Sequence, residues 1–136
     1  MAEDYDRIAQ DLQQVILEGY SEKFKNEFLN PKNIGELKHA DSHVRITGPC
    51  GDTVEIWLAV KDGRISDIGF MTDGCGATIT CASYVTGAAK GKTTEEALRI
   101  KPEDVIEYFE GLPDEHKHCA ELAVMTLAAA IEKVSK

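Results

Sequence analysis

The chain has 136 residues, of which 43% are hydrophobic and 29% are charged, and these proportions are typical of one globular domain. It contains no apolar run of about 18 residues, which excludes a membrane-spanning helix. A formal net charge of −9 argues against general nucleic-acid binding, because that function requires a basic surface. The acidic N-terminus, "MAEDYDRIAQ", lacks the apolar core of a secretory signal, so we expect a cytoplasmic protein.

Two helices are expected near the N-terminus. Residues 4–18 have apolar side chains at helical spacing, at Ile8, Leu12, Val15 and Ile16. A second, shorter helix is expected over residues 22–28, and the sequence "NPKNIG" that follows is typical of a turn.

Three strands are expected next. Residues 43–47 are short and extended. From residue 53 onward apolar and other side chains alternate with the period of a strand, with one face formed by Val54, Ile56, Leu58 and Val60. The dipeptide Asp62-Gly63 is a strong hairpin signal before "RISDIGFMT", the third strand. The three strands should form an antiparallel meander.

The rest of the chain is expected to be helical. The segment "TTEE" contains a capping box, formed by Thr93 and Glu96. The expected longer helices cover residues 77–89, the stretch between Pro102 and Gly111, and residues 117–134. The last of these is apolar on several sides and should lie against the sheet. A sheet followed by helices predicts an α+β fold.

Three of the four cysteines fall at the boundaries of these elements. Cys50 lies in the turn between the first two strands, Cys75 between the third strand and a helix, and Cys119 in the first turn of the last helix. Cys81 lies inside a helix, where we expect it to be buried in the packing. In a reducing cytosol, cysteines at such spacing are more often metal ligands or reactive thiols than disulfides, and no CxxC pair is present.

The three boundary cysteines are expected to converge, because the first and third strands of a meander run in the same direction and finish at the same end of the sheet. Two helix N-termini would then stabilise thiolates, the form that binds metals. Asp52 and His118 lie beside these cysteines in the sequence and can also ligate metals. The neighbouring glycines, at positions 51, 74 and 76, would leave room for a bulky ligand. Soft sulfurs with a harder oxygen or nitrogen suit zinc or an iron–sulfur cluster.

A series of motifs in this order resembles the IscU/NifU N-terminal family of iron–sulfur cluster assembly scaffolds. The motifs are "YSEKFKNEFLNPKNIGEL", "GPCGD", "GCGATITCAS", "GKTTEEAL" and "LPDEHKHCAELA". The resemblance runs from Tyr20 to Val134, within a single domain over residues 20–136. It leaves residues 1–19 as a helical extension that would pack on the domain or pair two chains into a homodimer.

The resemblance implies an α+β fold and a carrier function rather than an enzyme. In this family Cys50, Cys75 and Cys119 would receive sulfur from a cysteine desulfurase of the IscS/NifS type. They would hold a labile [2Fe–2S] cluster before it passes to apo iron–sulfur proteins. Asp52 would match the aspartate linked to iron entry and cluster lability, and His118 the histidine that serves as an alternative ligand.

The chain departs from the family pattern at two motifs. Cys81 stands where family members often carry serine, which leaves a fourth thiol as a candidate ligand. The sequence "LPDEH" replaces the Leu-Pro-Pro-Val-Lys contact for a dedicated Hsp70-type chaperone, so we expect no tight handoff to such a chaperone.

Two other functions compete with the scaffold. A zinc-dependent sulfur acceptor of the SufU type would use the same residues to hold Zn²⁺ and relay persulfide sulfur. The 43 residues between Cys75 and Cys119, and the presence of His118, favour the scaffold, although zinc would also suit its ligands in the isolated protein. A thiol enzyme with Cys119 or Cys75 as nucleophile and His118 as base is disfavoured, because adjacent helical residues point about 100° apart and His118 would not easily serve Cys119.

Overall fold

The computed structural model describes residues 20–49 and 51–134 of the chain. In chain order, its elements are α2 (Glu22–Leu29), β1 (Ser42–Thr47), β2 (Thr53–Lys61), β3 (Arg64–Thr72), α3 (Gly76–Ala89), α4 (Thr94–Ala97), α5 (Pro102–Tyr108), the 3₁₀ turn η1 (Asp114–His116) and α6 (Lys117–Val134). The helix expected over residues 4–18 lies outside the described residues.

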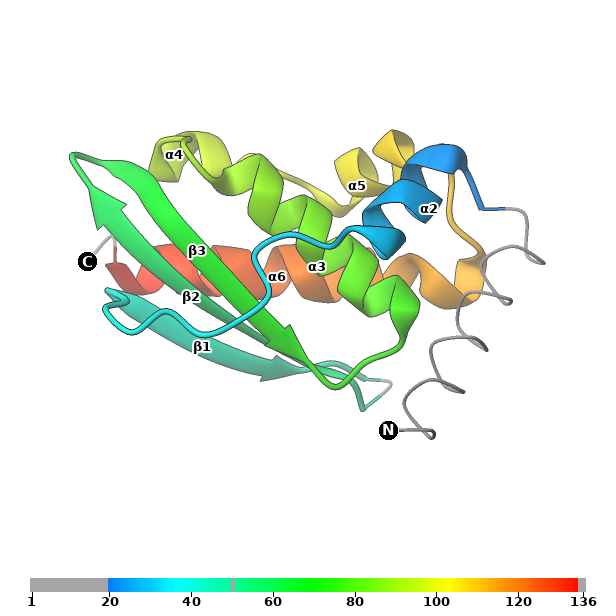
Figure 1. The fold of residues 1–136 in the computed structure, drawn as a ribbon, viewed down its shortest axis with the longest axis horizontal. Coiled ribbons are helices and arrows are strands. Elements are labelled where there is room, and N and C mark those ends of the chain that lie inside the picture. Colours follow the sequence, from blue (N-terminus) through cyan, green and yellow to red (C-terminus); the bar gives the residue numbers. More distant parts are fainter. Residues whose placement is uncertain (1–19, 50, 135–136) are drawn as a thin grey trace.

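The three strands form one antiparallel sheet in the order β1-β2-β3, which confirms the expected meander (Figure 1). The β2–β3 turn has positive φ angles of 54° at Asp62 and 76° at Gly63, as the Asp-Gly signal predicts. At the opposite end of the sheet, Thr47 pairs with Thr53 and Val54 pairs with Thr72. The loops that follow β1 and β3 therefore emerge at the same end of the sheet.

One face of the sheet carries the core, and a bulge preserves that face along β3. Ile56, Leu58 and Ile68 have at most 2% of their surface exposed, as the strand alternation predicts. Near the hairpin the register shifts between Ala59 and Val60, so that residues 65–67 of β3 face only two residues of β2. This bulge turns Ile65 toward the same core as Ile68 despite their odd spacing.

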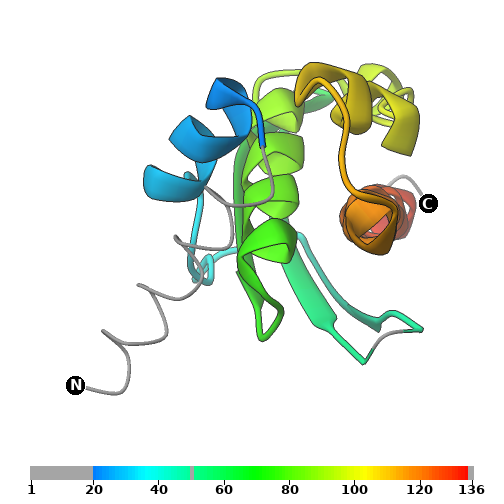
Figure 2. The ribbon, with the colours of Figure 1, turned by 90° about the vertical axis from the view of Figure 1, so that its right-hand side faces the viewer.

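Helices α3 and α6 lie side by side on this face, and together they form the second layer of the fold (Figure 2). Helix α6 packs on β1 and β2, whereas α3 packs on β3 and also contacts α2. The expectation that the last helix lies against the sheet is confirmed. Its apolar side chains and those of the sheet and α3 form one continuous core, so the fold is α+β.

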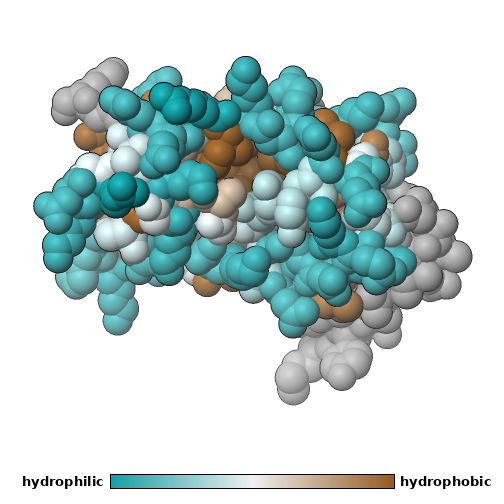
Figure 3. All heavy atoms as spheres, turned by 90° about the horizontal axis from the view of Figure 1, so that it is seen from above, coloured by the Kyte–Doolittle hydropathy of each residue, from teal (hydrophilic) through white to brown (hydrophobic). Residues whose placement is uncertain are grey.

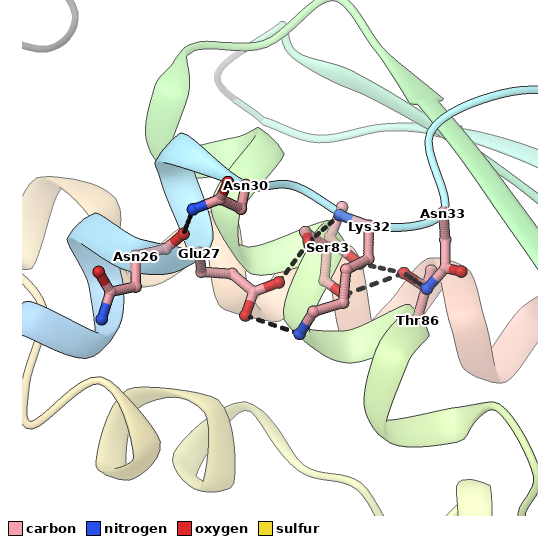
Figure 4. A network of polar contacts seen from close by, with 8 residues as sticks. Asn26, Glu27, Asn30, Lys32, Asn33, Ser83 and Thr86 are labelled. Atoms are coloured by element: carbon pink, nitrogen blue, oxygen red, sulfur yellow. Dashed lines mark hydrogen bonds and ion pairs between the residues drawn. The ribbon is translucent and has the colours of Figure 1, made fainter.

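A polar network fastens α2 and the turn that follows it onto α3 (Figure 4). Glu27 has only 5% of its surface exposed, and its carboxylate accepts hydrogen bonds from the Ser83 hydroxyl and from Nζ of Lys32 at 3.3 Å. The Lys32 amide donates to Oγ of Ser83 at 2.8 Å, and Asn33 Nδ2 donates to Oγ1 of Thr86 at 3.3 Å. Since each buried polar group has a partner, the network fixes α2 against α3.

The face of the molecule seen in Figure 3 is mainly hydrophilic, with apolar patches among the polar side chains. The large hydrophobic side chains exposed on it are Leu29, Ile34, Met71, Leu98 and Met125. Isolated apolar residues of this kind are ordinary on a protein surface. Among the helices of residues 20–134, none combines the length and hydropathy that crossing a membrane would require.

Candidate functional site

Three element ends meet at one end of the molecule: the β1–β2 loop, the β3–α3 loop and the start of α6 (Figure 1). Asp73 ties the first two loops together, because its Oδ1 atom accepts a hydrogen bond of 2.8 Å from the amide of Thr53. The Thr72 hydroxyl donates to the Thr53 carbonyl at 2.6 Å. On the other side, Leu122 of α6 packs against Gly48, where an added Cβ would lie 3.4 Å from Cδ2.

The β1–β2 loop presents Asp52 to this site. Its turn is closed by backbone hydrogen bonds between Gly48 and Asp52 (2.8 Å) and between Gly51 and Gly48 (3.0 Å). Gly51 has a φ of +91°, a conformation that few side chains tolerate. Cys50 belongs to the same loop but lies outside the described residues, so its assignment as a ligand stays a prediction.

The structure brings together two of the predicted thiols, those of Cys75 and Cys119. Cys75 is the N-cap residue of α3 and is partly exposed, whereas Cys119 is the third residue of α6 and is fully buried. Oγ1 of Thr78 lies 3.8 Å from the sulfur of Cys75 and 3.4 Å from that of Cys119. The same oxygen lies 3.2 Å from Oδ2 of Asp52, so the predicted aspartate also belongs to the cluster.

His118 completes the group of ligand atoms. Ligand atoms of Asp52, His118 and Cys119 all lie within 4.8 Å of one another, which is close enough for one metal ion to contact them. Nε2 of His118 lies 3.7 Å from Sγ of Cys119. The expectation that these adjacent helical residues could not face each other is therefore wrong. Both residues lie in the first turn of α6, and the imidazole is long enough for its Nε2 atom to fold back toward the neighbouring sulfur.

The two thiols of the site differ in acidity. The pKa of Cys75 is lowered from 9.0 to about 5, chiefly by a hydrogen bond with Cys119; burial opposes this shift, and the amides of Thr78 and Ala77 support it. The same contact with Cys75, together with burial, raises the pKa of Cys119. Of the two thiols, Cys75 therefore ionises more readily than Cys119.

The glycines around Cys75 serve packing rather than ligand space, which corrects the expectation from the sequence. A Cβ added at Gly74 would lie 2.7 Å from Oγ1 of Thr78, and one at Gly76 would lie 2.6 Å from Cε1 of Phe28. Neither Gly74 nor Gly76 has a positive φ angle, the backbone conformation that would require glycine. Among the glycines at positions 51, 74 and 76, Gly51 alone has a positive φ. These residues are small because side chains of the protein already occupy the adjacent space.

Cys81 and His116, which lie close in the sequence to the candidate ligands, also have defined positions. Cys81 is fully buried, as predicted, and burial raises its pKa. His116 is half-buried: its Nδ1 atom forms a hydrogen bond with the hydroxyl of Tyr20, and its ring stacks on that residue. This contact directs His116 toward α2.

Sequence reasoning missed Thr78, which contacts Asp52 and both described thiols. One signal was present: a hydroxyl residue three positions after Cys75 lies in the first turn of the predicted helix, on the side of the preceding loop. The contact to Cys119 bridges 41 positions and has no signature in the sequence.

Comparisons with known proteins agree with this arrangement. Residues 19–136 match the family described as NifU-like N terminal domain. The chain is 46% identical over 113 residues to the iron–sulfur cluster assembly scaffold protein IscU 1 of Archaeoglobus fulgidus, covering 82% of this chain and 74% of that protein. It is 40% identical over 117 residues to IscU of Escherichia coli K12, covering 82% of this chain and 91% of that protein.

Two solved structures share the fold at lower identity. A NifU-like N-terminal domain from Brucella abortus has a TM-score of 0.72 at 19% identity and covers 94% of this chain and 97% of its own. A SUF-system scaffold protein from Fervidobacterium islandicum has a TM-score of 0.69 at 20% identity and covers 82% of this chain and 96% of its own. These two likenesses show the fold, and the family match and the identity to IscU proteins show that this chain belongs to the NifU/IscU family.

Proposed function

We propose that this protein is a scaffold on which an iron–sulfur cluster is assembled and from which it is passed to apo-proteins. The proposed ligands are Cys50, Cys75 and Cys119, with Asp52 and His118 as the harder donors beside them. The observation that carries the proposal is the meeting of Asp52, His118 and Cys119 within 4.8 Å, with the hydroxyl oxygen of Thr78 lying between the sulfurs of Cys75 (3.8 Å) and Cys119 (3.4 Å). The membership of the family and the names of its IscU relatives support the same function.

The donor set fits a cargo that must be released. Thiolates bind iron and sulfide clusters strongly, whereas a carboxylate is a hard ligand that exchanges readily with solvent. Asp52 is half-buried and belongs to a loop, so it can leave the site without unfolding a helix or strand. A site built from four thiolates would hold the cluster more firmly and would suit a permanent electron-transfer centre better than a scaffold.

Sulfur would reach the site from a cysteine desulfurase. A thiolate of the scaffold attacks the terminal sulfur of the desulfurase persulfide, a new S–S bond forms on the scaffold, and the desulfurase cysteine leaves as thiolate. The exchange is balanced and needs no external oxidant. It requires a thiolate at neutral pH, and the lowered pKa of Cys75 supplies one beside Cys119.

Anaerobic reconstitution tests the proposal. The apoprotein is incubated with a cysteine desulfurase, cysteine and ferrous iron, and the visible absorption and Mössbauer spectra are recorded. We expect the spectrum of a [2Fe–2S] cluster, followed by its loss when an apo-ferredoxin is added and becomes holo-ferredoxin. The double variant Cys75→Ser/Cys119→Ser should form no cluster.

A zinc-dependent sulfur relay is the second candidate, because one carboxylate, one imidazole and one thiol are also typical zinc ligands. The same experiment separates the two functions. A protein that accepts persulfide sulfur and retains stoichiometric zinc, but develops no visible absorption with iron, would be a relay of the SufU type. Zinc that is displaced during cluster assembly would leave the scaffold function intact.

A further inference from the structure

Thr78 touches one group from each of the three element ends that form the site. Its side chain is fully buried, and its hydroxyl oxygen lies 3.2 Å from Oδ2 of Asp52 on the β1–β2 loop. The same oxygen lies 3.4 Å from Sγ of Cys119 on α6 and 3.8 Å from Sγ of Cys75 at the start of α3. A buried side chain in this place either fills space in the core or orients the groups around it.

The direction of the hydroxyl argues against mere packing. Three other fully buried threonines lie in α3 and α6, and each donates its hydroxyl proton to a backbone carbonyl four residues earlier in its own helix: Thr80, Thr86 and Thr126. Thr78 is the third residue of α3, so the residue four positions before it, Gly74, precedes the helix. The Thr78 hydroxyl therefore does not donate to a carbonyl of its own helix, as the other three do, and instead contacts Asp52 and Cys119 on other elements.

Gly74 fixes this orientation. A Cβ atom added at Gly74 would lie 2.7 Å from both Cβ and Oγ1 of Thr78 and 2.9 Å from its Cγ2. The backbone of the β3–α3 loop therefore closes directly over the threonine side chain. A β-branched side chain confined in this way keeps one rotamer, and its hydroxyl points constantly at the site.

We propose that Thr78 is a positioning residue that holds the Asp52 carboxylate beside the thiols and so preorganises the site for a metal ion. The inference rests on the proposed function, because it assumes that Asp52 and Cys119 are ligands. A hydroxyl has one proton and can donate it to only one acceptor at a time. The carboxylate is the nearer and stronger acceptor, so the proton goes to Asp52 rather than to the sulfur of Cys119.

The test is a titration of the apoprotein with Co²⁺ under anaerobic conditions, read from the thiolate-to-cobalt charge-transfer band. Loss of a group that orients a metal ligand typically lowers metal affinity about 10- to 100-fold. We expect Thr78→Val, which keeps the shape and removes the hydroxyl, to weaken Co²⁺ binding about tenfold. Thr78→Ser keeps the hydroxyl but not the β-branch, so it should bind Co²⁺ more tightly than Thr78→Val does.

Thr126→Val is the matched control. It also removes a fully buried threonine hydroxyl, on the helix that carries Cys119, but that hydroxyl bonds to the Leu122 carbonyl instead of the site. We expect its Co²⁺ affinity to equal that of the parent, even if its thermal midpoint falls. Equal losses of affinity in Thr78→Val and Thr126→Val would show a general effect of destabilisation and would overturn the proposal.

A double-mutant cycle shows whether Thr78 acts through Asp52. In an Asp52→Ala background, the additional effect of Thr78→Val on Co²⁺ affinity should disappear. An undiminished tenfold loss in that background, or no loss in the single variant, would overturn the positioning role. If Thr78→Val does not fold, the comparison of Thr78→Ala with Thr78→Ser gives the same result.

The titration also separates this inference from the proposed function. A parent protein without a charge-transfer band, or with a band that survives in Cys75→Ser/Cys119→Ser, would overturn the thiol site and the role of Thr78 with it. A normal band in the parent that persists at unchanged affinity in Thr78→Val would overturn the role of Thr78 alone.

Discussion

The ring of Phe28 on α2 packs directly against Gly76, the first residue of α3, leaving no space for a side chain there. Gly76 follows Cys75, so α2 supports the backbone that presents this thiol. The hydrogen bonds among Glu27, Ser83 and Lys32 hold α2 in the position that this contact requires. A helix that contributes no ligand thus helps to determine the geometry of the site.

The contact predicts opposite effects of alanine at two glycines of α3. Gly76→Ala would place its Cβ 2.6 Å from Phe28 and should lower the free energy of unfolding by about 1–3 kcal/mol. At Gly87 the nearest atom would be 3.9 Å away, so Gly87→Ala should raise it by up to about 1 kcal/mol through helix propensity. Urea denaturation of both variants measures the difference. A stabilised Gly76→Ala protein would show that Phe28 moves aside freely.

The lowered pKa of Cys75 predicts a particular pH dependence of alkylation. Because the folded-state pKa is about 5, the thiolate predominates above that pH, and its rate of reaction with iodoacetamide should rise through pH 5 and level off by pH 7. Burial and raised pKa values should leave Cys81 and Cys119 unmodified at pH 7. Peptide mass spectrometry after timed alkylation distinguishes the sites.

The cause of this shift can be tested separately. Cys119→Ala removes the hydrogen bond that contributes most to the lowered pKa, so the midpoint of Cys75 alkylation should move to higher pH. A midpoint that stays near pH 5 would assign the shift to the α3 amides instead.

Cys81 is expected not to be a ligand, although it is a fourth thiol in the same motif. It is fully buried inside α3, whereas Cys75 is the partly exposed N-cap residue of that helix. We expect Cys81→Ser to retain a reconstituted cluster, whereas Cys75→Ser and Cys119→Ser lose it. Iron and sulfide analysis after gel filtration measures retention. Loss of iron from folded Cys81→Ser would make Cys81 a ligand.

Asp52→Ala should hold an assembled cluster longer than the parent. The carboxylate is a hard, exchangeable ligand on a loop, and its removal eliminates the easiest route for water to reach the iron. If Asp52 only shaped the turn that carries Cys50, its loss would instead misplace that cysteine and weaken the cluster. The rate at which visible absorbance fades in air decides between them, since the two roles predict opposite changes.

Local patterns in the sequence determined the fold class and most of the ligand candidates. The strand alternation and the Asp-Gly turn define the meander. In a meander the first and third strands run parallel to each other, so the C-terminal ends of β1 and β3 lie at the same end of the sheet. Short motifs identified Cys75, Cys119, Asp52 and His118 as candidate ligands, because each motif places a ligand-forming side chain beside a glycine or another ligand within a few residues. The bulge that turns Ile65 inward has no comparable local signature.

Only the tertiary structure showed which residues other than the ligands shape the site. Thr78 reaches Cys119 across 41 positions, and Phe28 meets Gly76 across a helix–helix contact. Such contacts depend on how α2, α3 and α6 pack, and packing is a property of complete side-chain shapes in three dimensions. The periodicity of a sequence states which face of an element is buried, but it does not state which residue of another element that face will meet.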